Sequence, residues 1–372
     1  MKKNKVIHFG AGNIGRGLVA YIYQQNNYEI YFVDTNLDIV NKLNLEKKYK
    51  INYFNQKKFN LIKNFKALHI SETTEILKLI NEMDIISTSI GAENLHHLKP
   101  LFQKANFKNN TKIICFENGF KISDKFKEIL NLKNKNIDFI NSVIDRIIPL
   151  STKQNQILDV QSEKYFNVVL EQKNNFQLNK VQLTQNIDFF IIKKLIFVNA
   201  IHTTLGIVAA AKKYKYIHNA FKNKKIIFFI KNFIKAIISV FEKEFNANTK
   251  ELQKYSNQNL KRFKTKEFND LNIRLIRNLN SKFALNERFG IIFSLFQKYK
   301  IDNYYFKYIF ENIYKIKNLN DEFFANFFKE NNVTFFKEDI IKKFLVVFNR
   351  WWFGYLVRKR GSFFVEFKWI WK

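Results

Sequence analysis

Short, almost wholly apolar runs separated by polar segments fill the first half of the chain. They include Val6–Phe9, Glu29–Val33, Met83–Gly91, Lys112–Asn118 and Ile137–Ile144. Strands that are buried on both faces have this pattern, because helices cover both sides of a parallel sheet. We therefore predict an α/β domain with a doubly wound sheet. Polar residues follow several of the runs, at the strand ends where such sheets bind ligands.

The pattern changes in the second half, where apolar positions recur at the 3.6-residue spacing of helices and turn residues are few. The segment Lys225–Lys243 is one example. We predict an all-helical domain there. The intervening segment, residues 154–172, alternates polar and apolar residues and is expected to add strands to the sheet. We place the boundary after residue 188, which gives an α/β domain at 1–188 and a helical domain at 189–372.

Three glycines follow the first run directly. Gly10, Gly12 and Gly15 form the pattern Gly-x-Gly-x-x-Gly between an apolar run and a helical segment. In a Rossmann-type dinucleotide site the first glycine permits a tight turn, the second lets the backbone approach the pyrophosphate, and the third allows close helix packing. The helix start, with Asn13 and Ile14, offers free N–H groups to the phosphates. A glycine turn that binds nothing is the alternative.

Asp34 ends the second run, about 20 residues past the glycines. A carboxylate at this place accepts hydrogen bonds from the hydroxyls of the adenosine ribose, and it repels the 2′-phosphate of NADP. No arginine in the next few positions offsets that charge. The sequence therefore predicts that the cofactor is NAD.

The chain is strongly basic, since its 372 residues include 63 Lys and Arg against 32 Asp and Glu, a net charge of +31. Lys, Asn, Phe, Ile and Tyr dominate while Gly and Pro are scarce, which is the bias of A/T-rich codons. The lysines are scattered and form no compact basic block or interleaved aromatic platform. We therefore expect no specific nucleic-acid binding. The charge instead attracts a phosphorylated substrate.

The sequence carries few membrane or redox features. Cys115 is the single cysteine, so neither an intramolecular disulfide nor a cysteine-based zinc site can form. The basic start, Met1–Lys5, precedes an apolar run that the glycines interrupt at once, and we interpret that run as a strand. The best candidate for a membrane span, Ile226–Phe241, contains lysines. We expect a soluble cytoplasmic protein with no membrane partner.

The start of the helical half carries three polar residues at a fixed spacing. Lys194, Asn199 and His202 occupy positions i, i+5 and i+8. At about 100° per residue they lie at about 0°, 140° and 80° around an α-helix axis, so all three can address one site. The neighbouring Lys193 is assigned to the solvated face.

This spacing resembles the signature of the polyol-specific long-chain dehydrogenases. The blocks His8–Gly17 and Val143–Pro149 are similar to the branch of that family that acts on mannitol 1-phosphate. The similarity extends in pieces to about Arg288. It implies an NAD-dependent oxidoreductase that interconverts D-mannitol 1-phosphate and D-fructose 6-phosphate. It further implies a small-molecule polyol or sugar phosphate as the partner, and a monomer.

A secondary alcohol gives up hydride only as its hydroxyl proton leaves, so a base must reach that oxygen. Lys194 is the candidate, and its pKa must fall from ~10.4 toward ~7–8 through burial and neighbouring cations. Asn199 and, by resemblance, Asn118 donate hydrogen bonds to the developing alkoxide. His202 orients the substrate, and Asp145 positions a partner in the same network.

Each of these residues also has a purely structural interpretation. Lysines on a helix of a basic protein usually face solvent. Asn199 and His202 can fill a helix interface, and Asn118 can end a strand. Asp145 can form an ion pair with Arg146.

The phosphate of the substrate needs cations, and arginine suits phosphate because its planar fork makes two hydrogen bonds at once. The segment from Arg262 to Arg277 resembles the basic segment of the family, and we select Arg277 and Arg274 as phosphate ligands. The Pro-Leu-Arg-Lys run of the family is replaced by Leu279–Lys282, which loses one arginine. A related polyol or hexuronate dehydrogenase is the alternative. From other classes, a silent NAD-binding protein or a basic nucleic-acid binder remains open.

Two further features of the sequence are its histidines and its tryptophan-rich segment. The six histidines show no acidic partners at metal-site spacing, so we predict no metal. They are His8, His69, His96, His97, His202 and His218. The segment Phe344–Lys372 contains every tryptophan and does not resemble the family. A drifted terminal helix, a reading-frame artefact and an interfacial anchor remain open for it.

Overall fold

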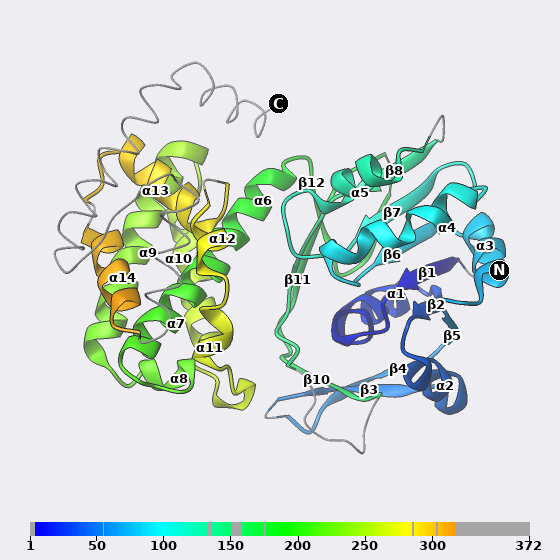
Figure 1. Ribbon diagram of the computed structural model, residues 1–372, viewed down its shortest axis with the longest axis horizontal. Coiled ribbons are helices and arrows are strands. Elements are labelled where there is room, and N and C mark those ends of the chain that lie inside the picture. Colours follow the sequence, from blue (N-terminus) through cyan, green and yellow to red (C-terminus); the bar gives the residue numbers. More distant parts are fainter. Residues whose placement is uncertain are drawn as a thin grey trace. The chain divides into compact units, whose positions relative to one another are not determined.

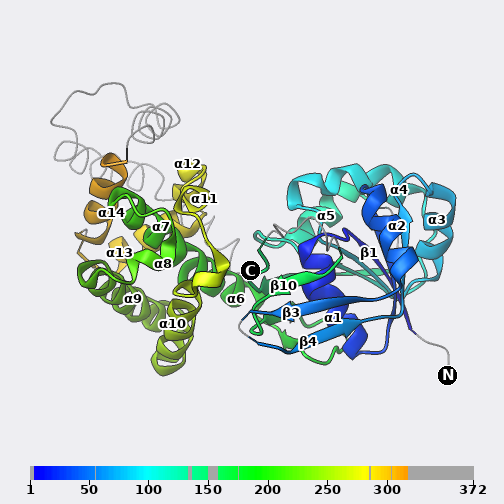
Figure 2. The same ribbon diagram turned by 90° about the horizontal axis from the view of Figure 1, so that it is seen from below.

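A computed structural model divides the chain into two compact units, Met1–Ile191 and Ile192–Lys372. It describes residues 4–54, 56–132, 136–149, 158–174, 176–284, 286–302 and 304–316. Within these residues the strands lie in the first unit, and the second unit is built from helices (Figures 1 and 2). The tryptophan-rich segment falls outside the described residues.

Six strands of the first unit form one sheet in which every neighbouring pair is parallel. In sheet order they are β5 (Phe65–His69), β2 (Glu29–Asp34), β1 (Lys5–Phe9), β6 (Ile85–Thr88), β7 (Thr111–Cys115) and β8 (Ile137–Ile140). The chain builds outward from β1 in one direction and then from β6 in the other. The predicted doubly wound fold is confirmed, and the glycine turn follows β1 at the point where the order reverses.

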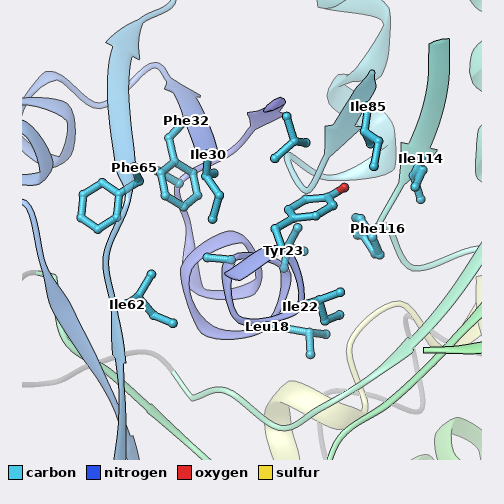
Figure 3. Packing of buried hydrophobic residues seen from close by; sticks show 14 of the residues in the cluster. Leu18, Ile22, Tyr23, Ile30, Phe32, Ile62, Phe65, Ile85, Ile114 and Phe116 are labelled. Carbon is cyan, nitrogen blue, oxygen red and sulfur yellow. The ribbon is translucent and has the colours of Figure 1, made fainter. Parts of the chain in front are cut away.

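Helices cover both faces of this sheet, and the strands alternate between the two cores with a period of two. On β1, Val6 belongs to one core, whereas Ile7 and Phe9 belong to the other. Figure 3 shows the first core, where Tyr23 of helix α1 points toward the sheet and its ring centroid lies 6.2 Å from that of Phe116. This core contains residues of the π-helix η1 (Gly15–Val19), α1 (Ala20–Gln25) and α2 (Leu37–Glu46). The second core, on the other face of the sheet, contains residues of α3 (Thr73–Glu82), the 3₁₀-helix η2 (Ala92–Leu98), α4 (Lys99–Lys104) and α5 (Ile122–Leu130).

The remaining strands form two separate three-stranded sheets. One contains β10 (Val160–Ser162), β3 (Tyr49–Tyr53) and β4 (Phe59–Ile62), and the other contains β12 (Gln182–Thr184), β11 (Asn167–Glu171) and β9 (Ser142–Asp145). The prediction that residues 154–172 extend the main sheet is therefore wrong. Their described strands pair with β3 and with β9 instead, because the main sheet already ends at β8.

The apolar run Ile137–Ile144 is divided between two sheets at Asn141, which is only 1% exposed. The Asn141 amide donates hydrogen bonds of 2.9 Å to Asp124 and to Glu171. The next residue, Ser142, donates a 2.6 Å hydrogen bond to the carbonyl of Cys115. A buried amide with partners on a helix and on another strand turns the chain here. The prediction of one continuous strand is therefore wrong.

The second unit packs around helix α7 (Ile201–Ala211), which is buried on almost every side. Helices α8 (Ile217–Ala220), α9 (Lys224–Phe245), α11 (Asn272–Leu275) and α14 (Tyr304–Tyr314) contact it, and α11 approaches so closely that a Cβ on Gly206 would lie 2.8 Å from Leu275. The other helices described from residue 187 onward are α6 (Ile187–Lys194), which crosses the boundary between the units, the π-helix η3 (Leu195–Ala200), α10 (Thr249–Phe263), η4 (Lys266–Phe268), α12 (Leu279–Phe283) and α13 (Arg288–Lys298). The predicted helical second half is confirmed for the residues that the structure describes, which end at 316.

One stretch of the described residues, Ile187–Ala211, is long and apolar enough to cross a membrane. It replaces Ile226–Phe241 as the best candidate by composition. However, 67% of its most apolar window is buried inside the protein, which is typical of a core helix.

Candidate active site

The three glycines after β1 meet three different steric demands. Gly10 has a φ of +105°, and a Cβ there would lie 2.6 Å from the carbonyl oxygen of Ser89. A Cβ on Gly15 would lie 2.0 Å from the carbonyl oxygen of Gly10, so the helix packs directly on the turn. A Cβ on Gly12 would meet nothing within 4 Å. The turn is thus closed at Gly10 and Gly15 and open at Gly12, as a backbone that receives a phosphate must be.

Asp34 is the last residue of β2 and fixes the glycine turn. Its Oδ2 accepts a 2.6 Å hydrogen bond from the N–H of Ala11, and its Oδ1 accepts one of 2.8 Å from the N–H of Asn36. On the other side of the turn, the Asn13 side chain donates a 3.0 Å hydrogen bond to the carbonyl of Pro149. The sequence predicted a ribose contact for Asp34 but not this support of the turn.

His8 supports the turn from inside the sheet. Its ring is fully buried, with Nδ1 2.8 Å from the hydroxyl of Ser87 and Nε2 2.9 Å from that of Ser89. Burial lowers the pKa of His8 to about 3, partly opposed by a backbone hydrogen bond at Gly10. The ring is therefore neutral at physiological pH and serves the turn as a structural group.

We expect His8 to make the protein sensitive to acid. Its pKa is lower in the folded than in the unfolded chain, so the unfolded chain binds the proton first and stability falls as the pH drops below about 6.5. By pH 4 this single group removes about 3 kcal/mol from the free energy of unfolding. Urea unfolding at pH 7 and pH 4 measures the loss. The His8→Gln variant should be less stable at pH 7 but should lose less between the two pH values, and an equal loss would contradict this role.

Glu117 is a buried carboxylate that sequence reasoning missed. It lies beyond the end of β7 and accepts hydrogen bonds from the hydroxyl of Thr88 (3.0 Å), from the N–H of Ile90 (2.7 Å) and from the N–H of Gly91 (3.0 Å). Burial raises the pKa of Glu117, although these three donors oppose the shift. The carboxylate thereby fixes the loop after β6, next to the predicted site residue Asn118.

The strand end at Asp145 is built around an arginine with a structural role. Arg146 is 7% exposed and donates hydrogen bonds to the carbonyl of Gly17 (2.6 Å) and to the carbonyl of Glu163 (3.1 Å). Asp145 itself is buried at the end of β9. Arg146 thus connects the helix after the glycine turn to the strand that carries Asp145.

In the second unit, Lys194 ends α6 and the π-helix η3 begins at the next residue. The N–H of Ile201 bonds back to the carbonyl of Ile196, five residues earlier. Bonding over five residues brings positions i and i+5 toward the same side, so Asn199 no longer lies about 140° from Lys194 as on an α-helix. The α-helical angles predicted for this pair are therefore wrong. Lys194 and Asn199 are both half-buried.

Lys193 does not lie on a solvated face, and that prediction is wrong. Its Nζ lies 4.8 Å from the centroid of the Tyr255 ring on α10. Burial lowers the pKa of Lys193, partly opposed by the charge of Glu251. The two adjacent lysines therefore both lie against the protein, and Lys193 has an aromatic partner.

His202 is held by an aromatic ring and a carboxylate. Its ring stacks on Phe263 with centroids 4.3 Å apart and planes 2° from parallel, and its Nε2 lies 2.8 Å from Asp270 Oδ2. The other Asp270 oxygen accepts a 3.0 Å hydrogen bond from Nε of Arg274. Burial alone would raise the pKa of Asp270, but the hydrogen bonds and charges of His202 and Arg274 outweigh it and lower the pKa. Sequence reasoning gave Asp270 no role.

Cations gather on the segment after Asp270. The side chain of Arg274 is 61% exposed while it holds Asp270, and Arg277 is exposed. Lys282 is half-buried and donates to the carbonyls of Leu275 (2.9 Å) and Arg277. Burial, together with the charges of Arg288 and Arg274, lowers the pKa of Lys282 to about 8. Arg274 and Arg288 are therefore close enough for their charges to act on Lys282.

Arg288 begins α13 and reaches back toward the residue that follows His202. Its Nη1 donates a 3.4 Å hydrogen bond to the hydroxyl of Thr203, and its Nε lies 3.5 Å from Glu287. Helix α13 also packs against η3, which carries Asn199. The structure therefore adds Lys282 and Arg288 to the cations that sequence reasoning selected. Among the described residues, His, Cys, Asp and Glu form no group of three or more that could hold a metal ion.

Two family models match the chain. The model described as the mannitol dehydrogenase Rossmann domain matches residues 4–185, and the model described as the mannitol dehydrogenase C-terminal domain matches residues 186–310. Together they cover residues 4–310.

Two similar curated proteins carry the name mannitol-1-phosphate 5-dehydrogenase. The protein of Mycoplasma pneumoniae is 41% identical over 304 residues, which cover 81% of this chain and 83% of the relative. The protein of Mycoplasmopsis pulmonis is 42% identical over 325 residues, which cover 87% of this chain and 89% of the relative.

Two solved structures share the fold at low identity. A substrate-free D-sorbitol dehydrogenase is 14% identical with a TM-score of 0.72, covering 83% of this chain and 79% of its own. A mannitol 2-dehydrogenase of Pseudomonas fluorescens, solved with NAD and D-mannitol, is 13% identical with a TM-score of 0.63, covering 84% and 78%.

Proposed function

The chain belongs to the mannitol dehydrogenase family, and we propose that it is an NAD-dependent oxidoreductase that interconverts D-mannitol 1-phosphate and D-fructose 6-phosphate. The observation that carries the choice of substrate is the set of cations beside the His202–Asp270 pair, because a phosphorylated polyol needs such charge. The names of the two relatives at 41% and 42% identity support the same substrate.

The residues of the glycine turn fit a dinucleotide. The open space at Gly12 admits a phosphate, and the helix start at Asn13 and Ile14 offers backbone N–H groups to it. The two amides bound to Asp34 use about half of the acceptor sites of a carboxylate, so ribose hydroxyls can still bind it. When bound, NAD accepts hydride from the polyol, and NADH returns it to the ketose.

The polar side chains selected from the sequence supply the proton chemistry in this proposal. Lys194 takes the proton from the reacting hydroxyl and returns it in the reverse direction. Asn199 and Asn118 donate hydrogen bonds to the oxygen as negative charge develops on it. His202, fixed by Phe263 and Asp270, binds a hydroxyl of the substrate. Asp145 remains a proposed positioning residue.

We assign the phosphate to Arg277 and Arg274, which were selected from the sequence, and we add Lys282 and Arg288 to them. Arg288 presents a guanidinium at the first turn of α13, where the helix dipole also favours an anion. Lys282 gains a nearby counter-charge when a phosphate binds, which raises its pKa again and strengthens binding.

The experiment that tests the function compares ketoses with and without phosphate. We expect oxidation of NADH with fructose 6-phosphate and little oxidation with fructose. Replacing Lys282 or Arg288 with Met should raise the KM for fructose 6-phosphate at least tenfold, since each removes a charge-assisted hydrogen bond worth about 1.5–3 kcal/mol. The exposed Lys264→Met variant is the matched control. Arg277→Met tests the selection made from the sequence.

Three results would contradict this function. Equal turnover of fructose and fructose 6-phosphate would favour a dehydrogenase of unphosphorylated polyols, and turnover of a hexuronate alone would favour that class. Binding of NADH without turnover of any ketose would indicate a silent nucleotide-binding protein. We further propose that the enzyme works as a cytoplasmic monomer, which size-exclusion chromatography with light scattering tests.

A further inference from the structure

Arg16, the residue directly after Gly15, has an unusual environment. It is only 5% exposed, and its Nε and Nη1 atoms are buried without a hydrogen-bond partner. Its backbone groups, in contrast, are satisfied, since its N–H bonds to the carbonyl of Gly12 (2.9 Å) and its carbonyl accepts the hydroxyl of Tyr49 (2.8 Å). A buried guanidinium without partners costs free energy, so its retention needs an explanation.

The helix geometry relates Arg16 to the open side of the turn. The bond from its N–H to the carbonyl of Gly12 places the two residues four apart on one face of the helix. Helical side chains lean toward the helix N-terminus, which here is the end that carries Gly12 and its empty space. Arg16 therefore belongs to the face that the glycine turn leaves open.

A second buried arginine of the same unit provides the comparison. Arg146 is 7% exposed, almost as buried as Arg16, yet its guanidinium donates to the carbonyls of Gly17 and Glu163. An arginine with a structural role is thus fully bonded in this fold. Arg16 lacks such partners and is next to the proposed nucleotide site.

The charges around Arg16 point to an anion. Burial lowers the pKa of Arg16, and the nearby Tyr49 and Asp34 oppose this shift. The Asp34 carboxylate, however, binds the N–H groups of Ala11 and Asn36. A phosphate would provide what the guanidinium lacks, namely negative charge and acceptor oxygens for Nε and Nη1.

We propose that Arg16 is the anion receptor of the nucleotide site and that its guanidinium binds a phosphate of the diphosphate bridge. The inference rests on the proposed use of NAD. It adds a side-chain ligand to a site otherwise formed by backbone N–H groups. It also explains how the Asp34 carboxylate and a bound diphosphate can lie near each other, because the positive charge of Arg16 offsets the repulsion between them.

The test measures ligand binding and stability, without turnover, in Arg16→Met and Arg16→Lys. NADH binding is followed by fluorescence, and ADP-ribose, NADPH and adenosine are measured by displacement of NADH. In Arg16→Met we expect at least tenfold weaker binding of NADH and ADP-ribose and less than a twofold change for adenosine. Arg16→Lys should lie between Arg16→Met and the unaltered protein, because it keeps the charge but loses the planar fork.

Thermal unfolding separates this role from a structural one. The ligand-free Arg16→Met protein should be at least as stable as the unaltered protein, because it no longer buries an unsatisfied charge, while its gain in Tm on adding NADH should shrink. The matched variant Arg146→Met should lose stability without ligand. A drop in the ligand-free Tm of Arg16→Met with intact NADH affinity would overturn the inference.

Other results of the same measurements also test the assignment of Arg16 to a phosphate of the nucleotide. Equal losses for adenosine and ADP-ribose would overturn the assignment to a phosphate, and a loss confined to NADPH would place the arginine on a 2′-phosphate instead. If the unaltered protein binds no NADH, the proposed function fails. If it binds NADH and Arg16→Met binds equally well, only this inference fails.

Discussion

Replacing Lys194 with alanine is expected to lower kcat by about three orders of magnitude, within the range that positioned general acid–base groups supply. Without the amine, the hydroxyl proton has no acceptor as hydride leaves the carbon. The affinity for NADH should change by less than about twofold, because the proposed nucleotide residues lie in the first unit whereas Lys194 lies in the second. Stopped-flow turnover and NADH fluorescence titration measure the two quantities separately.

The adjacent lysine provides a matched control for this experiment. Lys193 is also half-buried and also carries an amine on α6, but its Nζ lies over Tyr255. Lys193→Ala should keep kcat within a few-fold of the unaltered enzyme while it lowers stability slightly. Near-normal turnover of Lys194→Ala, or an equal loss in both variants, would contradict the assignment.

The second large effect is expected at Asp270, which touches His202 and no proposed reacting atom. Asp270→Asn keeps the shape but removes the charge that orients the imidazole, so kcat/KM should fall roughly 10–100-fold, as for carboxylates that orient functional histidines elsewhere.

A double-mutant cycle separates this positioning role from a structural one. His202→Asn and Asp270→Asn should each reduce kcat/KM. If the two residues act together, kcat/KM of the double variant should be close to that of the less active single variant. Multiplicative losses in the double variant would show that Asp270 does not act through His202.

The sequence predicted those parts of the fold that depend on local pattern. Apolar runs and the glycine spacing identified the doubly wound sheet, and helical periodicity identified the second half. The division of residues 137–144 at Asn141 was missed, because a run of apolar residues does not reveal that one amide bonds to Asp124 and Glu171, which lie 17 and 30 positions away. Such turns depend on hydrogen bonds between a single polar side chain and partners far away in the sequence.

The candidate site shows the same limit. Glycines at short fixed spacing can be identified from sequence, and so can the order of Lys194, Asn199 and His202. Asp270 lies 68 residues beyond His202, so only the fold brings the two together. The π-helical geometry after Lys194 and the buried, unpartnered Nε and Nη1 atoms of Arg16 likewise depend on packing that no local pattern records.

The most direct test of the account is the fate of a labelled hydride. NADH that carries deuterium at the reactive position of its nicotinamide ring is incubated with fructose 6-phosphate and the protein, and the product is examined by NMR. We predict mannitol 1-phosphate with deuterium on the carbon that was the ketone, and almost none with Lys194→Ala. Unlabelled product, or labelled product formed equally by Lys194→Ala, would contradict it.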